Sequence, residues 1–282
     1  MTDCHYEIKG SDDKPILVDV HLPQHVSGTY PVIIFSHGFK GFKDWGTFNQ
    51  LAGWFACKGF CFVKFNFSHN GTTPGNPEEF TDLCSFAANT LSKEMDDLGK
   101  VIDFVLGKEF SEKGAAPDEN RVYLMGHSRG GGIAILKAAE DKRVKKLVTW
   151  AAVNDFDKSW TGKLAEKWAK EGKIEVLNSR TGQRMPLNYS LYEDYQAHLD
   201  RLYIPAAVMK LKIPFLIVHG RADETVCVRA AYEMNDWNKD CTELYIVEDA
   251  NHVFGARHPW NSGQFPTHTR DALHKTLNFL LN

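Results

Sequence analysis

The sequence predicts an α/β fold in which helices cover both faces of a mostly parallel central sheet. Apolar runs with the composition of buried strands alternate with segments whose apolar residues recur at helical spacing. The chain has 282 residues, of which 43% are hydrophobic and 24% charged, so one large domain with a full core is expected. In such sheets chemistry is placed in the loops that follow the strands, so candidate functional residues should lie there.

Eight segments have the composition of strands. Residues 4–9 and 16–22 alternate loosely around a polar turn and should pair as an antiparallel hairpin at the sheet edge. The other six are mostly apolar, as strands buried on both faces must be, and comprise residues 31–35, 60–67, 121–125, 146–153, 213–218 and 242–247.

Five segments have the periodicity of helices. Asp44 is expected to cap the first, whose apolar positions run from 45 to 55 before Gly59 ends it. The second has its apolar face within residues 91–105 and ends at Gly107. The other three comprise residues 133–139, 230–237 and 269–281.

The β-α alternation breaks at residues 155–210, which we interpret as a small inserted cap between two parts of the core, residues 1–154 and 211–282. This insert is rich in Lys, Glu, Trp and Tyr and has few Pro or Gly, unlike a linker. Its expected elements are a helix with Trp160, Leu164 and Trp168 on one face, a hairpin of residues 173–177 and 184–187, and a helix over residues 192–202.

A Gly-x-Ser-x-Gly turn centred on Ser128 joins the strand at 121–125 to the helix at 133–139. A serine on a sharp turn between strand and helix is held in a strained conformation and is exposed as a nucleophile. Gly126 and Gly130 meet the demand of such a turn for small neighbours. The motif also occurs by chance, but the strand before it and the helix after it favour a catalytic Ser128.

A serine hydroxyl needs a general base, and a histidine base needs a carboxylate to orient it. His252 follows the last expected strand and Asp223 follows the strand before it, so both should lie at the same sheet edge as Ser128. Asp249 is a rival acid, but it is too close in sequence to His252 to approach from the neighbouring strand. We therefore predict Ser128, His252 and Asp223 as the catalytic residues.

The oxyanion of a tetrahedral intermediate requires N–H donors. We expect them to be the backbone N–H of Arg129, which follows the nucleophile, and that of Phe39, which follows the strand at 31–35. His37, His127 and His219 are interpreted as scaffold histidines without a catalytic role.

These segments together resemble the α/β-hydrolase superfamily, in which the three catalytic residues also occur in the order Ser, Asp, His. The resemblance rests on residues 126–130, 37–39, 220–223 and 251–252 and covers nearly the whole chain except the cap. Within the superfamily, residues 37–41, the loop at 65–71 and the compact cap resemble bacterial feruloyl/cinnamoyl esterase-like hydrolases. The resemblance implies an α/β-hydrolase fold and a serine hydrolase, most simply a carboxylesterase that acts on a small-molecule ester through an acyl-enzyme.

Several alternatives stay open. Trp160, Trp168, Tyr189 and Tyr192 either wall an apolar substrate pocket or attach the cap to the core. The same catalytic residues would serve a peptidase or an acyl-thioesterase. For a thioester of coenzyme A, the cap lysines, which are also explained as a solvated helix face, would bind the substrate: Lys158, Lys163 and Lys167. A non-catalytic binding protein on this fold would be expected to lack a catalytic residue, and none is missing.

The remaining expectations concern partners and location. The formal charge of −3 gives no support to a nucleic-acid partner. The six cysteines show no zinc spacing, so neither a metal nor an organic cofactor is expected. The N-terminus has no signal-peptide pattern and no apolar run is long enough to span a membrane, so we expect a cytoplasmic protein. A homodimer is left open.

Overall fold

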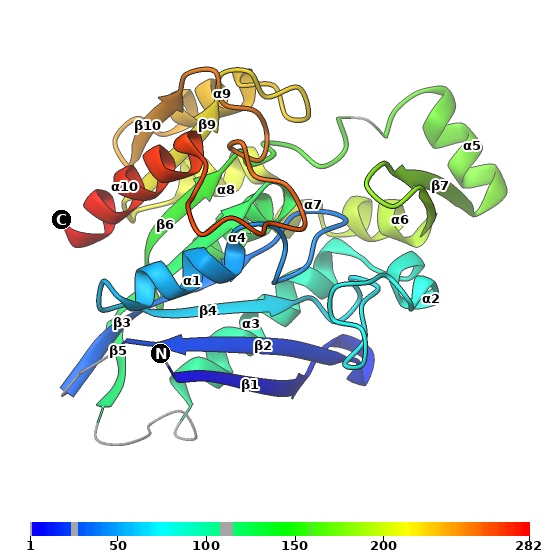
Figure 1. The fold of residues 1–282 in the computed structure, drawn as a ribbon. Coiled ribbons are helices and arrows are strands. Elements are labelled where there is room, and N and C mark those ends of the chain that lie inside the picture. Colours follow the sequence, from blue (N-terminus) through cyan, green and yellow to red (C-terminus); the bar gives the residue numbers. More distant parts are fainter. Residues whose placement is uncertain (1, 24–27, 108–114, 159) are drawn as a thin grey trace.

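A computed structural model describes residues 2–23, 28–107, 115–158 and 160–282. Its centre is an eight-stranded sheet in the order β1-β2-β4-β3-β5-β6-β9-β10 (Figure 1). The two neighbour pairs β1–β2 and β2–β4 are antiparallel and the other pairs are parallel, so the predicted mostly parallel sheet and its edge hairpin are confirmed. The strands are β1 (Thr2–Lys9), β2 (Pro15–Leu22), β3 (Gly28–Ser36), β4 (Cys61–Asn66), β5 (Ala115–His127), β6 (Val144–Trp150), β9 (Phe215–Gly220) and β10 (Thr242–Val247).

Helices cover both faces of this sheet, as predicted. On one face lie α1 (Phe48–Ala56) and α10 (Thr267–Leu281) (Figure 1). Their side chains share an apolar cluster with side chains of the strands. On the other face, α3 (Leu91–Leu106), α4 (Arg129–Glu140) and α9 (Arg229–Trp237) contribute to a second cluster. Two apolar layers therefore hold the sheet from opposite sides, and central strands such as β4 and β9 are buried on both faces.

The segment between β6 and β9 interrupts the alternation of strands and helices, and its last helix, α8 (Ile204–Lys210), returns to pack on α4 and α9. In chain order it contains α5 (Lys163–Glu171), β7 (Lys173–Asn178), β8 (Gln183–Asn188), α6 (Ser190–Ala197), α7 (Leu199–Leu202) and α8. Strands β7 and β8 form a separate antiparallel hairpin, as expected, and with α5 they project from the core in Figure 1. The helix expected to include Trp160 begins only at Lys163, after the left-handed Gly162.

Two short helices escaped prediction. Helix α2 (Leu83–Ala87) is too short to show a periodic pattern, and its side-chain cap, Asp82, lies in a polar stretch that resembles a loop. Helix α8 lies where the helical expectation had ended. It begins with Pro205 in its first turn, where a missing N–H costs nothing.

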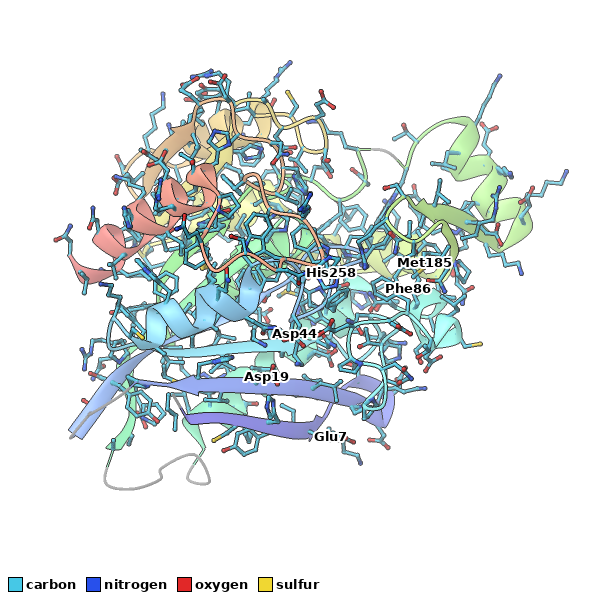
Figure 2. All side chains as sticks on the ribbon, viewed as in Figure 1. Glu7, Asp19, Asp44, Phe86, Met185 and His258 are labelled. Atoms are coloured by element: carbon cyan, nitrogen blue, oxygen red, sulfur yellow. The ribbon has the colours of Figure 1, made fainter. Side chains whose placement is uncertain are left out.

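The expectation that Asp44 caps α1 is wrong. Thr47 occupies the cap position, without a side-chain bond. Asp44 instead belongs to a buried charge cluster, which also contains Asp19, Lys43 and Lys64; Figure 2 labels its two aspartates. In this cluster both lysine Nζ atoms lie 2.5–2.6 Å from oxygens of both aspartates. Because an unpaired buried ammonium is very costly, pairing the two lysines takes precedence over capping a helix.

Candidate active site

The turn between β5 and α4 holds Ser128 at a φ of +55°, a strained value for a residue with a side chain. The glycines on either side make this turn sterically possible. A Cβ on Gly126 would lie 2.4 Å from the carbonyl oxygen of Gly130, and a Cβ on Gly130 would lie 2.3 Å from that of His37. The backbone therefore has the geometry that the Gly-x-Ser-x-Gly pattern predicts.

Asp223 and His252, which follow β9 and β10, are brought together. His252 Nδ1 donates to Asp223 Oδ2 across 2.8 Å, while Asp223 Oδ1 accepts the backbone N–H groups of Thr225 and Val226, also at 2.8 Å each. Asp249, the rival acid, is exposed. Both oxygens of the buried Asp223 carboxylate thus accept hydrogen bonds, which fixes its orientation.

His219 gives the same carboxylate a further contact. Its Nε2 lies 3.2 Å from Asp223 Oδ2 and 2.8 Å from the carbonyl oxygen of Val226. Burial opposes ionisation of Asp223, but the hydrogen bonds from His219 and His252, the charge of His252 and the Val226 N–H outweigh it and hold the pKa of this carboxyl well below its usual value. Asp223 is therefore a carboxylate at any neutral pH.

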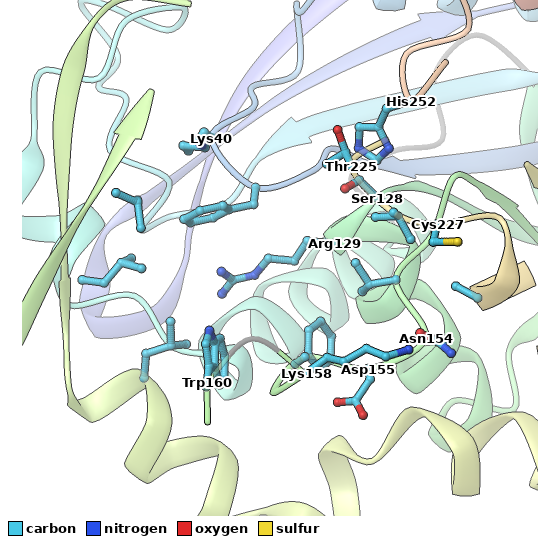
Figure 3. Close-up of a pocket in the computed structure, with 18 of the residues that line it drawn as sticks. Lys40, Ser128, Arg129, Asn154, Asp155, Lys158, Trp160, Thr225, Cys227 and His252 are labelled. Carbon is cyan, nitrogen blue, oxygen red and sulfur yellow. The ribbon is translucent and has the colours of Figure 1, made fainter. Parts of the chain in front are cut away.

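Ser128 and His252 line one cavity and lie at the same end of it (Figure 3). A second histidine supports the loop of His252: His127 Nε2 donates to the His252 carbonyl oxygen across 2.9 Å, and the two rings lie 4.9 Å apart. Burial lowers the pKa of His127 to about 3, so this ring is neutral at neutral pH. His127 acts on the position of the His252 loop and does not touch the cavity.

The loop after β3 approaches the turn closely. A Cβ on Gly38 would lie 3.0 Å from Ser128 Cβ, and Phe39 lines the cavity beside Ser128 and Arg129. Within the described residues, the backbone N–H groups of Phe39 and Arg129 have no hydrogen-bond acceptor. His37 Nδ1 donates to the Gly38 carbonyl oxygen across 2.9 Å, and burial lowers the pKa of His37 to about 4. Two free donors therefore lie beside the serine.

The cavity measures about 630 Å³ and has two sides of different character. Asn154, Asp155 and Lys158 lie on one side in Figure 3 and make it polar. The other side is apolar and is formed by residues of the segment after β6: Trp160, Leu164, Ile174, Val176, Leu187 and Leu191.

The four aromatic residues expected to wall the pocket separate into two groups. Trp160 lines the cavity, whereas Trp168, Tyr189 and Tyr192 do not. Trp168 is fully buried and its indole N–H donates to the Leu187 carbonyl oxygen across 2.9 Å; the rings of Tyr189 and Tyr192 stack at 5.4 Å. These three therefore build the interior of the inserted segment, which corrects the pocket interpretation for them.

The cap lysines also separate. Lys158 lines the cavity, while Lys163 and Lys167 are exposed on α5 outside it. Sequence reasoning missed Lys40, which lines the cavity and donates to the Leu177 carbonyl oxygen, and Glu94, which pairs with Arg129. A charged residue at a buried position of α3 was the only available signal for Glu94.

The described residues contain neither a metal-binding cluster nor a membrane-spanning helix. No group of three or more His, Cys, Asp or Glu side chains is arranged there to hold a metal ion. In the same residues, no helix has both the length and the apolar character needed to cross a membrane.

Comparisons with known proteins agree with this architecture. The model of the prolyl oligopeptidase family matches residues 47–282. The chain is 24% identical over 239 residues to "Putative esterase/lipase 2" of Mycoplasma pneumoniae, covering 78% of this chain and 81% of that protein. An uncharacterised 31.7 kDa protein from the traX-finO intergenic region of Escherichia coli is 26% identical over 198 residues; the match covers 67% of this chain and 63%, less than two thirds, of that relative.

Among solved structures, Est1E from Butyrivibrio proteoclasticus with ferulic acid bound superposes with a TM-score of 0.72 at 18% identity, covering 99% of this chain and all of that one. At this identity the similarity concerns the fold alone. This similarity confirms the predicted α/β-hydrolase fold, and the family match over residues 47–282 together with that fold confirms the sequence resemblance to the α/β-hydrolase superfamily.

Proposed function

We propose that this chain, which belongs to the prolyl oligopeptidase family, is a serine hydrolase that cleaves carboxylic esters through an acyl-enzyme formed on Ser128. In this proposal Ser128 Oγ attacks the acyl carbon while His252 Nε2 takes its proton. Asp223 holds His252 in the required orientation. The N–H groups of Phe39 and Arg129 bind the oxyanion, His252 returns the proton to the leaving alcohol, and water then releases the acid.

One observation carries the proposal: the strained Ser128 shares a cavity with His252, which is hydrogen-bonded to Asp223. Because the carboxylate accepts the Nδ1 proton of His252, Nε2 is left without a proton and is able to act as a base. No hydrogen bond joins Ser128 Oγ to His252 in this structure; such contacts often form only when substrate is bound.

The apolar side of the cavity supports an ester with an apolar acyl or aryl group. Its side chains come from the β7–β8 hairpin and its neighbours and offer no acceptors for a peptide backbone. The printed name of the Mycoplasma relative, an esterase/lipase, and the ferulic acid bound by Est1E point the same way. We place the acyl or aryl group against this apolar side.

A peptidase is the second candidate, because the matched family is named for peptide cleavage. The polar side of the cavity, with Asn154, Asp155 and Lys158, favours it by offering groups for the charged or amide parts of a peptide. An acyl-thioesterase would use Lys158 alone among the three lysines expected for coenzyme A, since the other two lie outside the cavity.

A substrate panel tests these candidates. It contains p-nitrophenyl esters of graded acyl length, methyl ferulate, prolyl and alanyl p-nitroanilides, and an acyl-coenzyme A. The variants are Ser128→Ala and, as a matched control, Ser190→Ala, an exposed serine outside the cavity.

We expect ester turnover that Ser128→Ala abolishes and Ser190→Ala leaves unchanged. Turnover of the anilides alone would replace the esterase proposal by the peptidase. Folded protein that turns over no member of the panel would refute the hydrolase proposal and favour a non-catalytic binding protein.

A further inference from the structure

A buried ion pair lies directly behind the proposed oxyanion donors. Arg129 Nε donates to Glu94 Oε2 across 3.1 Å, and Asn89 Nδ2 donates to Glu94 Oε1 across 2.6 Å. The residues Arg129, Glu94 and Asn89 are all less than 10% exposed. The pair connects the first turn of α4 to the first turn of α3, so it fixes the Arg129 side chain from the core.

The guanidinium also touches the other donor segment. It lies 5.1 Å from the centre of the Phe39 ring. The Phe39 ring in turn packs against the ring of Phe86 in α2, with the two ring centres 5.7 Å apart. Figure 3 shows the Arg129 side chain extending from the turn along the cavity. Arg129 thus supplies one proposed oxyanion donor through its backbone N–H, and its side chain supports the loop of Phe39, which supplies the second donor.

The Phe39 loop needs such support. Lys40, the next residue, has a φ of +55°, and the Phe39 N–H has no acceptor among the described residues to hold it. A loop with a strained residue and an unbonded amide keeps its position only if its surroundings impose it. The contact between the Phe39 ring and the buried Arg129 guanidinium supplies such a constraint, because cation–π attraction increases when the cation is removed from water.

We propose that Glu94 and Arg129 are positioning residues that set the distance between the Phe39 N–H and Ser128. The inference rests on the proposed function, since it concerns the same oxyanion site. Oxyanion donors act only at about 2.7–3.1 Å from the developing charge, so a small shift of Phe39 weakens binding of the transition state while binding of the substrate is preserved. The expected signature is a loss in kcat at nearly constant KM.

Three variants test the pair. Arg129→Met removes the guanidinium but keeps the backbone N–H. Glu94→Gln leaves one carbonyl oxygen for two donors, so either Arg129 or Asn89 loses its acceptor. Adding Asn89→Asp to Glu94→Gln restores the pattern, because the Gln oxygen accepts from Arg129 and the Gln amide donates to the new carboxylate.

The matched control is Lys137→Met. Lys137 is a buried cation on the same helix, paired with Glu140, but it lies two turns beyond Arg129 and outside the cavity. Its loss reports the general cost of removing a buried, paired cation from α4. Thermal unfolding of each variant shows whether Arg129→Met folds; if it does not, Glu94→Gln and its rescue decide the question.

We expect kcat on a p-nitrophenyl ester to fall by about 10- to 100-fold in Arg129→Met and Glu94→Gln, with KM changed less than about threefold. Affinity for an aryl boronic acid, which adds to Ser128 Oγ as a tetrahedral mimic, should fall in parallel. The double variant should regain most of kcat, and Lys137→Met should keep it.

The proposal is overturned if the two single variants match Lys137→Met in kcat, or if KM rises while kcat stays constant. Retention of activity in Ser128→Ala would instead overturn the proposed function, so the two failures are distinguishable.

Discussion

Asp223→Asn should lower kcat by about 10⁴, or about 5.4 kcal/mol of activation free energy at 1.36 kcal/mol per tenfold. The structure fixes how the amide must sit. Two backbone N–H groups point at Oδ1, so the Asn oxygen has to stay there and its NH₂ group has to face His252 Nδ1. A donor in that place forces the proton of His252 onto Nε2, which then cannot accept the proton of Ser128.

The assay is steady-state hydrolysis of a p-nitrophenyl ester, combined with ¹⁵N NMR of the imidazole to identify the His252 tautomer. The fold should persist, because the acceptor for the two amides is retained. Asp249→Asn, at the exposed rival acid, is the control and should leave kcat within about twofold. A loss below about 100-fold in Asp223→Asn, or a larger loss in Asp249→Asn, would refute the assignment of the acid.

Further outcomes are expected elsewhere in the chain. Asp19→Asn should lower the free energy of unfolding by about 3–5 kcal/mol at pH 7, as a break in the buried charge cluster. Burial opposes ionisation of Asp19, but the two lysines of the cluster hold its pKa far below the unfolded value of about 3.9. This stabilisation is therefore present above pH 4 and is lost as the pH falls further. Urea unfolding of the wild type and the variant at pH 7 and pH 3 measures it, and an equal loss of stability at both pH values would contradict it. Val176→Trp should fill the apolar side of the cavity and lower turnover of p-nitrophenyl octanoate at least about tenfold relative to p-nitrophenyl acetate. An unchanged ratio of the two rates would place the acyl group elsewhere. His37 Nε2, Asn89 Oδ1 and Arg129 Nη2 are buried without a protein partner, and their residues line a small cavity of about 10 Å³. A high-resolution crystal structure should show one ordered water there that donates to the first two atoms and accepts from the third, and a dry cavity would contradict this.

Local patterns were sufficient for most of the fold. Buried strands are apolar throughout, helices repeat their apolar residues every three to four positions, and both signals lie within one short segment. The turn at Ser128 was predictable from its Gly-x-Ser-x-Gly pattern, although only the demand on Gly126 is local. A Cβ on Gly126 would lie 2.4 Å from the Gly130 carbonyl oxygen, whereas a Cβ on Gly130 would lie 2.3 Å from that of His37, after β3.

What could not be predicted depends on pairings between distant segments. Lys64 lies inside an apolar strand, and only the approach of Asp19 and Asp44 from elsewhere in the chain explains it. Glu94 and Arg129 meet in the same way across 35 positions. The aromatic residues after β6 illustrate the limit: their composition fits a pocket wall or a packed interior equally, and only the arrangement of β8 and α6 sends Trp168 inward.

Covalent labelling tests the central claim, that Ser128 is the nucleophile, most directly. The native protein is treated with a fluorophosphonate, and intact mass and peptide mapping locate the adduct, with heat-denatured protein and Ser128→Ala as controls. The account predicts one adduct per chain, on Ser128, that is absent from both controls and is slowed by Asp223→Asn. An unlabelled native protein, or an adduct on another residue, would contradict it.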